Sequence, residues 1–143
     1  MRYSVDLLDG LARLLDAAGV GTYRPASVYT AGETAITIAA APPEPERVIV
    51  LTAYPVAESP ALTDTTTGVQ VRTRAGTDPR DVEALDEAVF DVLHAAGPFT
   101  FGTARVQLIY RTSGALLGPD ANGRMERTAN YYARAHRAHP RLE

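Results

Sequence analysis

Cysteine, lysine and tryptophan are all absent from this chain of 143 residues. Without cysteine the protein can form no disulfide, thiolate metal site or iron–sulfur cluster, and it has no cysteine nucleophile. The absence of cysteine does not identify a redox compartment, because a cysteine-free chain is stable in an oxidising and in a reducing compartment. All 14 basic residues are arginine, which we attribute mainly to a GC-rich coding sequence, although arginine also favours planar, bidentate contacts at interfaces.

Long apolar runs are missing as well. No stretch approaches the ~20 uninterrupted apolar residues that a membrane span needs. Asp6, Asp9 and Asp16 interrupt the apolar pattern near the N-terminus, which is not typical of a secretory signal. We therefore expect a soluble protein that is not exported. The length fits a single domain, 1–143, and a domain of roughly 150 residues buries about two thirds of the surface that its unfolded chain exposes.

Catalytic and cofactor motifs are not recognisable either. His136 and His139 form only an H-x-x-H without a third ligand nearby, so a solvated tail is favoured over a zinc site. No serine lies in a G-x-S-x-G context, and no segment matches a P-loop or a dinucleotide fingerprint. We predict no catalytic, cofactor-binding or metal-binding residue, and hence a protein that is not an enzyme.

The first of two predicted helices covers about residues 5–18. Ser4 is its expected N-cap, and Gly19 is suited to the position just after its end. Leucines recur at the three and four spacing of one helical face, at positions 7, 8, 11, 14 and 15.

The second helix is predicted to begin after Asp78, with Pro79 at its first position, and to end before Gly97-Pro98. Its apolar stripe predicts a surface helix laid on a sheet. The acidic residues fall largely on the solvent side: Asp81, Glu83, Asp86, Glu87 and Asp91. An acid and base pair among them is possible in principle, but helical spacing explains them better as a solvated face.

Five segments have strand character: 34–40, 47–56, 68–76, 103–114 and 124–137. The connection 57–67 is predicted as a loop, and the length and polar face of 124–137 predict a terminal or edge strand. The order α-β-β-β-α-β-β is typical of an α+β fold. We expect a mostly antiparallel, mixed sheet of about five strands with two main helices packed on it.

The stretch GPDANGR, 118–124, resembles a binding loop at first sight. A calcium loop fails because Asp120 and Asn122 supply only two side-chain ligands and Tyr131 stands where a glutamate would close the loop. A phosphate site would need a helix after the glycines, where a strand is predicted. Asn122-Gly123 instead predicts the turn of the last β-hairpin, lengthened by SGALLGPD into an arm.

Charge is distributed unevenly along the chain. Residues 1–100 hold 7 Arg and 14 acidic residues, a net charge of −7, whereas 101–143 hold 7 Arg and 3 acidic residues, a net charge of +4. Such segments suit subunits that meet each other, or two differently solvated surfaces. Arginines on polar strand faces favour a subunit interface over a nucleic-acid site, because the chain is acidic overall. The predicted interface residues are Arg72, Arg74, Arg105, Arg111, Asp120, Asn122, Arg124 and Arg127.

Three stretches together carry a family resemblance: VIVLTAYPV, VQVRTRAGTDPRDVEALDEAVFDVLH and RVQLIYRTSGALLGPDANGRMERTANYYARAHRAHP. They resemble minor capsid or tail-terminator proteins of long-tailed phages, especially those that infect actinobacteria. The most telling parts are R-T-R-A-G-x-D-P-R-D and S-G-x-x-L-G-x-D-x-N-G-R-x-E-R-x-x-N-Y-Y. The resemblance implies one tail-terminator-like domain over 1–143. It also implies a ring, usually a hexamer, that caps the head-proximal end of the tail tube and ends its polymerisation.

The same resemblance implies the partners and the location. Expected partners are further copies of the chain, the tail tube protein and a head-completion or neck protein. DNA would pass through the lumen without sequence-specific binding, and no membrane is involved. The expected location is the tail or neck of the virion, with the host cytoplasm during assembly. Two alternatives stay open: another neck component, such as a head-completion or connector protein, and a small nucleic-acid-binding module with salt-dependent DNA affinity.

Overall fold

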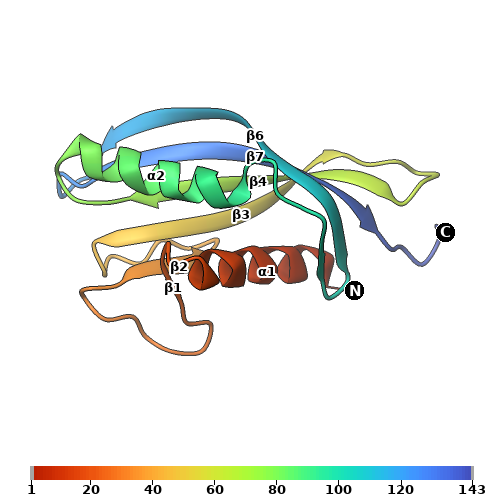
Figure 1. Cartoon of the computed structure of the whole chain (residues 1–143), viewed down its shortest axis with the longest axis horizontal. Coiled ribbons are helices and arrows are strands. Elements are labelled where there is room, and N and C mark those ends of the chain that lie inside the picture. Colours follow the sequence, from red (N-terminus) through yellow and green to blue (C-terminus); the bar gives the residue numbers. More distant parts are fainter. Residues whose placement is uncertain (1, 143) are drawn as a thin grey trace.

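A computed structural model describes residues 2–142, which form two helices packed on one seven-stranded sheet (Figure 1). The helices are α1 (Tyr3–Ala17) and α2 (Pro79–Leu93). The strands are β1 (Thr22–Tyr23), β2 (Thr34–Ile38), β3 (Arg47–Ala57), β4 (Asp64–Arg74), β5 (Phe99–Phe101), β6 (Ala104–Pro119) and β7 (Met125–Arg137). The predicted α+β class and both predicted helices are confirmed.

The order across the sheet is β1-β2-β3-β4-β7-β6-β5. β2 pairs in parallel with β1 and β3, and the other neighbours pair antiparallel. The mixed, mostly antiparallel character is confirmed, but the expectation of about five strands is too low. The two additional strands, β1 and β5, contain 2 and 3 residues, so they are too short for an alternating pattern to be visible in the sequence.

The prediction of an edge strand over 124–137 is wrong. β7 lies between β4 and β6 and pairs with both along nearly its whole length, from Met125 to Arg137. Its polar residues line one face of the sheet, whereas the prediction assigned them to an exposed edge. A polar face shows that one side of a strand is uncovered, but it does not show whether the backbone has neighbours.

The loop predicted over 57–67 is also shorter than expected. β3 extends to Ala57 and β4 already begins at Asp64, so the threonine cluster 65–67 belongs to a strand. Threonine is β-branched and suits a strand, but three identical residues in a row give no alternation that the sequence could reveal. Similarly, the predicted arm after Ser113 is the continuation of β6, which runs to Pro119.

Both helices cover the same face of the sheet, and the main core lies between them and the strands (Figure 1). Its largest fully buried side chains include Leu7, Leu11 and Leu15 of α1 and Leu93 of α2. Tyr131 of β7 is the largest of the fully buried side chains. Neither helix in residues 2–142 is long and apolar enough to span a membrane.

The helix ends follow the sequence only in part. The predicted N-cap role of Ser4 is wrong, since α1 begins at Tyr3 and its first turn receives no side-chain cap. At the other end, Gly19 has φ 77 and its N–H donates to the Asp16 carbonyl, as expected for a glycine that ends a helix. Asp78 caps α2 as predicted, because its carboxylate accepts a hydrogen bond from the Arg80 backbone N–H at 3.0 Å.

The opposite face of the sheet is mostly uncovered. Beside Ala35, Val48 and Val50, which pack with Tyr29, its β4, β7 and β6 region carries polar and aromatic side chains. We call this region the open sheet face. It consists of Tyr54, Gly68, Gln70, Arg72, Arg105, Leu108, Tyr110, Ser113, Thr128, Asn130, Tyr132 and Arg134.

Candidate assembly surfaces

A buried carboxylate joins α2 to β6 and β7. Asp86 is only 2% exposed, and its Oδ2 lies 3.4 Å from Arg111 Nη1 and 3.4 Å from Arg127 Nε. Arg127 Nη1 also donates to Glu83 Oε1 at 2.6 Å. Arg111 additionally stacks over the Phe90 ring, 4.1 Å from its centroid. Two of the predicted interface arginines therefore contact the helix of their own chain.

The placement of Asp86 on the solvent side of α2 is corrected by this network. Asp86 follows Val82 by four residues and precedes Val89 by three, so it lies at the flank of the buried stripe. Burial raises the pKa of Asp86, although Arg127 and Arg111 act in the opposite direction. Burial likewise raises the pKa of Tyr131, which lies in the core close to this carboxylate.

Arg74 is buried, although its strand face is otherwise open. The connection over 41–46 folds over this end of β4, and Arg74 donates to the carbonyls of Pro42, Pro45 and Glu46 at 2.7, 2.8 and 2.9 Å. Burial lowers the pKa of Arg74. A position on a polar strand face is thus a poor predictor of exposure where a loop covers the end of the sheet.

Arg72 and Arg124 are paired within the chain as well. Arg72 Nε and Nη2 donate to Glu126 Oε1 and Oε2, both at 3.0 Å, across the β4–β7 pair. Arg124 Nε donates to Asp120 Oδ2 at 2.9 Å, and its Nη1 donates to the Pro43 carbonyl at 2.6 Å. These bidentate and forked contacts are the ones that a guanidinium makes best.

The GPDANGR stretch forms the β6–β7 turn, as predicted. Asp120 Oδ1 accepts hydrogen bonds from the backbone N–H groups of Asn122 and Arg124, both at 2.9 Å, and Gly123 has φ 77. Burial acts to raise the pKa of Asp120, but the hydrogen bonds from Arg124 and Asn122 hold it below its ordinary value. Of the two side chains that suggested a cation site, the Asp120 carboxylate therefore stabilises the turn, and Asn122 lies exposed at its tip.

Among the predicted interface residues, Arg105 differs from the other arginines. It is exposed on the open sheet face and forms no ion pair within residues 2–142. Arg134 is likewise exposed on this face without an ion pair, and the sequence prediction omitted it. Arg137 and Arg141 are also exposed without an ion pair within residues 2–142, but Arg137 lies over the Tyr3 ring of α1, 4.7 Å from its centroid, and Arg141 lies beyond the last strand. Arg134 belongs to the polar face of 124–137, so the alternation of that strand is the signal that could have identified it.

The open sheet face also carries aromatic side chains that the prediction missed. The Tyr54 ring covers Gly68 on the neighbouring strand so closely that an added Cβ there would lie 2.2 Å from the ring. Tyr54 Oη donates to Asn130 Oδ1 at 3.2 Å. Tyr110 and Tyr132 meet edge to face with their ring centroids 6.0 Å apart. Tyrosine and arginine are enriched at protein interfaces, so this composition is typical of a contact surface.

The outer side of α2 has the opposite charge. Asp81, Glu87 and Asp91 are exposed there, and none of them forms an ion pair within residues 2–142. Arg80 is the nearest base on the helix, and it bonds to Asp78 at the N-terminus. The acidic side chains therefore face solvent without compensation.

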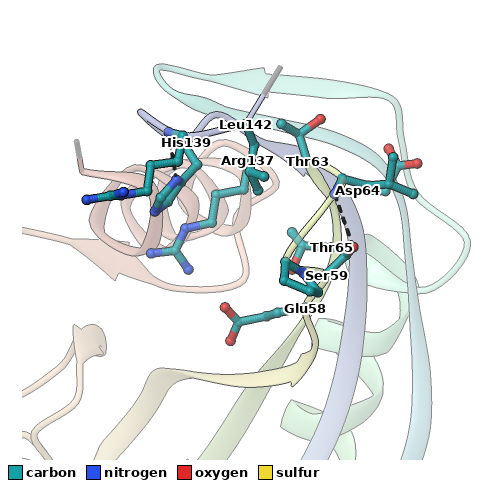
Figure 2. A pocket seen from close by; sticks show the side chains of 11 residues that line it. Glu58, Ser59, Thr63, Asp64, Thr65, Arg137, His139 and Leu142 are labelled. Carbon is teal, nitrogen blue, oxygen red and sulfur yellow. Dashed lines mark hydrogen bonds between the residues drawn. The ribbon is translucent and has the colours of Figure 1, made fainter.

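The two ends of the long axis have different features (Figure 1). The β6–β7 hairpin forms one end, where Leu116 and Leu117 are 48% and 52% exposed on the outer edge of β6. The β3–β4 connection and the last residues form the other end. Figure 2 shows a cavity of about 380 Å³ there, between Glu58 and Ser59 of the connection and Arg137 and His139 near the C-terminus. Its lining carries both charges.

Residues 2–142 contain no group of three His, Asp or Glu side chains arranged to hold a metal ion. His136 Nδ1 is hydrogen-bonded to Thr63 Oγ1 at 2.8 Å, and His139 Nδ1 accepts from the Arg141 backbone N–H at 3.1 Å. The two histidines of the H-x-x-H therefore make separate local contacts. Within residues 2–142, the surfaces that stay without partners are the open sheet face and the acidic outer side of α2.

Comparisons with known proteins identify the kind of assembly. A family described as bacteriophage tail terminator protein matches residues 14–137. The chain belongs to this bacteriophage tail terminator family, and it is accordingly a structural component of a phage tail. The predicted resemblance is confirmed.

A solved structure shares the fold. One chain of the "Virion of native gene transfer agent (GTA) particle" aligns with a TM-score of 0.57 and 14% identity, over 88% of this chain and 84% of that chain. At this identity the likeness shows the fold alone. No curated protein sequence matches the chain significantly.

Proposed function

We propose that the protein is the tail terminator of its phage. Copies assemble into a hexameric ring at the head-proximal end of the tail tube, end tube polymerisation and provide the surface to which the head-completion protein binds. Family membership supports this role. The observation that carries it is the open sheet face, a surface with tyrosine and arginine side chains that no other part of residues 2–142 covers.

A ring of identical copies needs two different surfaces on each copy. Heterologous contacts join the front of one subunit to the back of the next, and they close when the rotation between subunits divides a full turn. The chain meets this requirement because the outer surface of its helices and its open sheet face differ in composition and charge. A two-fold dimer would instead require one surface that complements itself.

The two ends of the molecule suit two different axial partners. The β6–β7 hairpin end and the end formed by the β3–β4 connection lie apart along the long axis (Figure 1). In the ring, one end contacts the tail tube protein and the other contacts the head-completion protein. Exposed Leu116 and Leu117 make the hairpin arm the stronger candidate for an apolar docking contact. Arg105 and the turn residue Asn122 are the members of the predicted interface set that remain available for contacts with other chains.

The role requires no reaction. The protein acts by binding, DNA passes through the lumen without sequence readout, and assembly takes place in the host cytoplasm before the subunit becomes part of the virion.

Electron microscopy and light scattering of the purified protein, alone and with tail tube protein, test this proposal. Rings of six copies and tubes closed at one end are the expected result. Monomers only, together with tubes whose ends stay open to growth, would exclude it. Labelling the subunit in assembled particles separates the terminator from another neck component, because only the terminator contacts the last ring of tube protein.

A further inference from the structure

The outer side of α2 presents an acidic row of fixed length. Asp81, Glu87 and Asp91 span ten residues of the helix, which corresponds to about 15 Å. They are exposed and have no ion-pair partner within residues 2–142. A helix normally places such residues toward solvent, so the row alone defines no site. Whether the acidic row forms a contact depends on whether another surface of the molecule carries the complementary charge.

The open sheet face offers the complementary charge. Arg105 and Arg134 are exposed on it without an ion-pair partner. Arg72 is neutralised by Glu126. Asp64 lies opposite His136, which in turn lies opposite Arg105, and Asp64 and Glu58 line a hollow together with Arg134. Neither acid forms an ion pair with these arginines within residues 2–142. Between the two free arginines and the turn end, the face is occupied by Tyr54, Tyr110 and Tyr132 and by amide side chains.

The architecture also leaves a place for a helix. On its other side the sheet is covered by α1 and α2, whereas the β4, β7 and β6 region of the open face has no covering layer within the described chain (Figure 1). The helices are already the second layer of this domain, and an antiparallel sheet can leave its other face in water. The tyrosine rings distinguish this face from an ordinary solvated one, and a helix of another copy would remove them from water.

The geometry points to a specific lateral contact: the acidic outer side of α2 in one copy packs on the open sheet face of the next copy, with Glu87 and Asp91 near Arg105 and Arg134. The occupant is a second copy of this chain, because the acidic row and the face that complements it belong to the same sequence. The contact is heterologous, as a ring requires. It rests on the proposed ring, and it names the surfaces that form the ring.

A charge exchange tests this contact. In the acid-swapped variant, Glu87→Arg and Asp91→Arg, both contact surfaces become basic. In the base-swapped variant, Arg105→Glu and Arg134→Glu, both become acidic. Each variant alone should need a protein concentration at least roughly tenfold above that of the parent to assemble, because like charges meet at every contact. Mixed in equal amounts, the two should assemble again, because opposite charges meet at every contact of an alternating ring.

A matched control makes the same change in net charge at residues outside the proposed contact. Glu44→Arg with Glu46→Arg gives the same net charge as the acid-swapped variant on exposed residues of the 41–46 connection, and it should assemble like the parent. Thermal unfolding of all variants should match the parent, since every substituted side chain is exposed. Parent-like assembly of either swapped variant, or failure of the mixture to assemble, would overturn the contact.

Crosslinking gives a second readout that does not depend on stable rings. The chain lacks cysteine, so Ala84→Cys on the outer side of α2 and Gln70→Cys on the open sheet face are the only thiols in their variants. A short bis-maleimide should join Ala84→Cys to Gln70→Cys in a mixture, and should not join either variant to itself. A chain carrying both substitutions should give a ladder that ends at six copies. Self-joined Ala84→Cys dimers, or no mixed product, would contradict the contact.

The inference and the proposed function can fail separately. If the parent protein forms rings on tubes while the charge exchange has no effect, the proposed function is kept and the lateral contact is rejected. If the parent forms no ring on tubes, the proposed function falls whatever the crosslinks show.

Discussion

Two groups of arginines in one molecule behave differently. Arg72, Arg74, Arg111, Arg124 and Arg127 form ion pairs or carbonyl contacts within the chain. Within residues 2–142, Arg105 and Arg134 form neither. Both groups lie on strands or turns of the same sheet and have the same chemistry. The difference shows that an arginine on a strand can either stabilise the fold or stay available for another chain. The acceptors that lie near it within its own chain determine which of the two occurs.

The largest expected effect on the free energy of unfolding comes from Arg74, a member of the group with contacts inside the chain. Arg74→Met would leave the carbonyls of Pro42, Pro45 and Glu46 without their donors in a buried place. We expect a loss of about 3 kcal/mol in the free energy of unfolding, measured by urea denaturation. Arg74→Lys should recover only part of it, because an ammonium group cannot reproduce the planar fork. A parent-like denaturation midpoint for Arg74→Met would contradict the account of this arginine.

The buried carboxylate of α2 comes next. Asp86→Ala removes the shared partner of Arg111 and Arg127, and we expect a loss of about 2 kcal/mol at neutral pH by the same measurement. Glu87→Ala, one residue further and exposed, is the matched control and should change stability by less than about 0.5 kcal/mol. Equal effects of the two substitutions would show that the network does not hold α2 on the sheet.

The same carboxylate predicts a pH dependence. Burial raises the pKa of Asp86 above the ordinary value of 3.8, so the proton-linked part of its contribution to stability is fully present below 3.8 and is lost as the pH rises through the raised pKa. The contacts of the ionised carboxylate with Arg111 and Arg127 remain at neutral pH. Asp86→Asn should therefore flatten the pH dependence of stability in that range. Stability curves of parent and variant that stay parallel from acidic to neutral pH would contradict the direction of the shift.

The turn carboxylate should act in the opposite direction and more weakly. Bonds from Asn122 and Arg124 hold the pKa of Asp120 below 3.8, so its contribution is present above 3.8 and is lost as the pH falls through the lowered pKa. Asp120→Asn should reduce the thermal unfolding temperature at neutral pH and leave it nearly unchanged at the most acidic pH. A reduction of the same size at both would rule out a role for the charge.

The smallest effect on folding belongs to the second group of arginines. Arg134→Ala should change the free energy of unfolding by less than about 0.5 kcal/mol, while raising the concentration at which rings form. The comparison between the groups would fail if Arg134→Ala destabilised the monomer as much as Arg74→Met.

Much of the fold could be predicted because its signals are local. The leucine spacing of α1, the Asp78-Pro79 start of α2 and the Asn122-Gly123 turn each depend on a few neighbouring residues. The central position of β7 and the strand assignment of the threonines depend on distant partners, which one sequence does not display. The candidate interface residues were harder to predict. Alternation along a strand indicates on which face Arg72 and Arg74 lie, but it does not reveal that Glu126 binds Arg72 and that backbone carbonyls bind Arg74.

Imaging the assembled phage particle with this subunit located tests the central claim most directly. The account predicts one ring of six copies between the last ring of tail tube protein and the head-completion protein, with α2 of each copy against the open sheet face of the next. A different location in the particle, or a single copy without a ring, would contradict it.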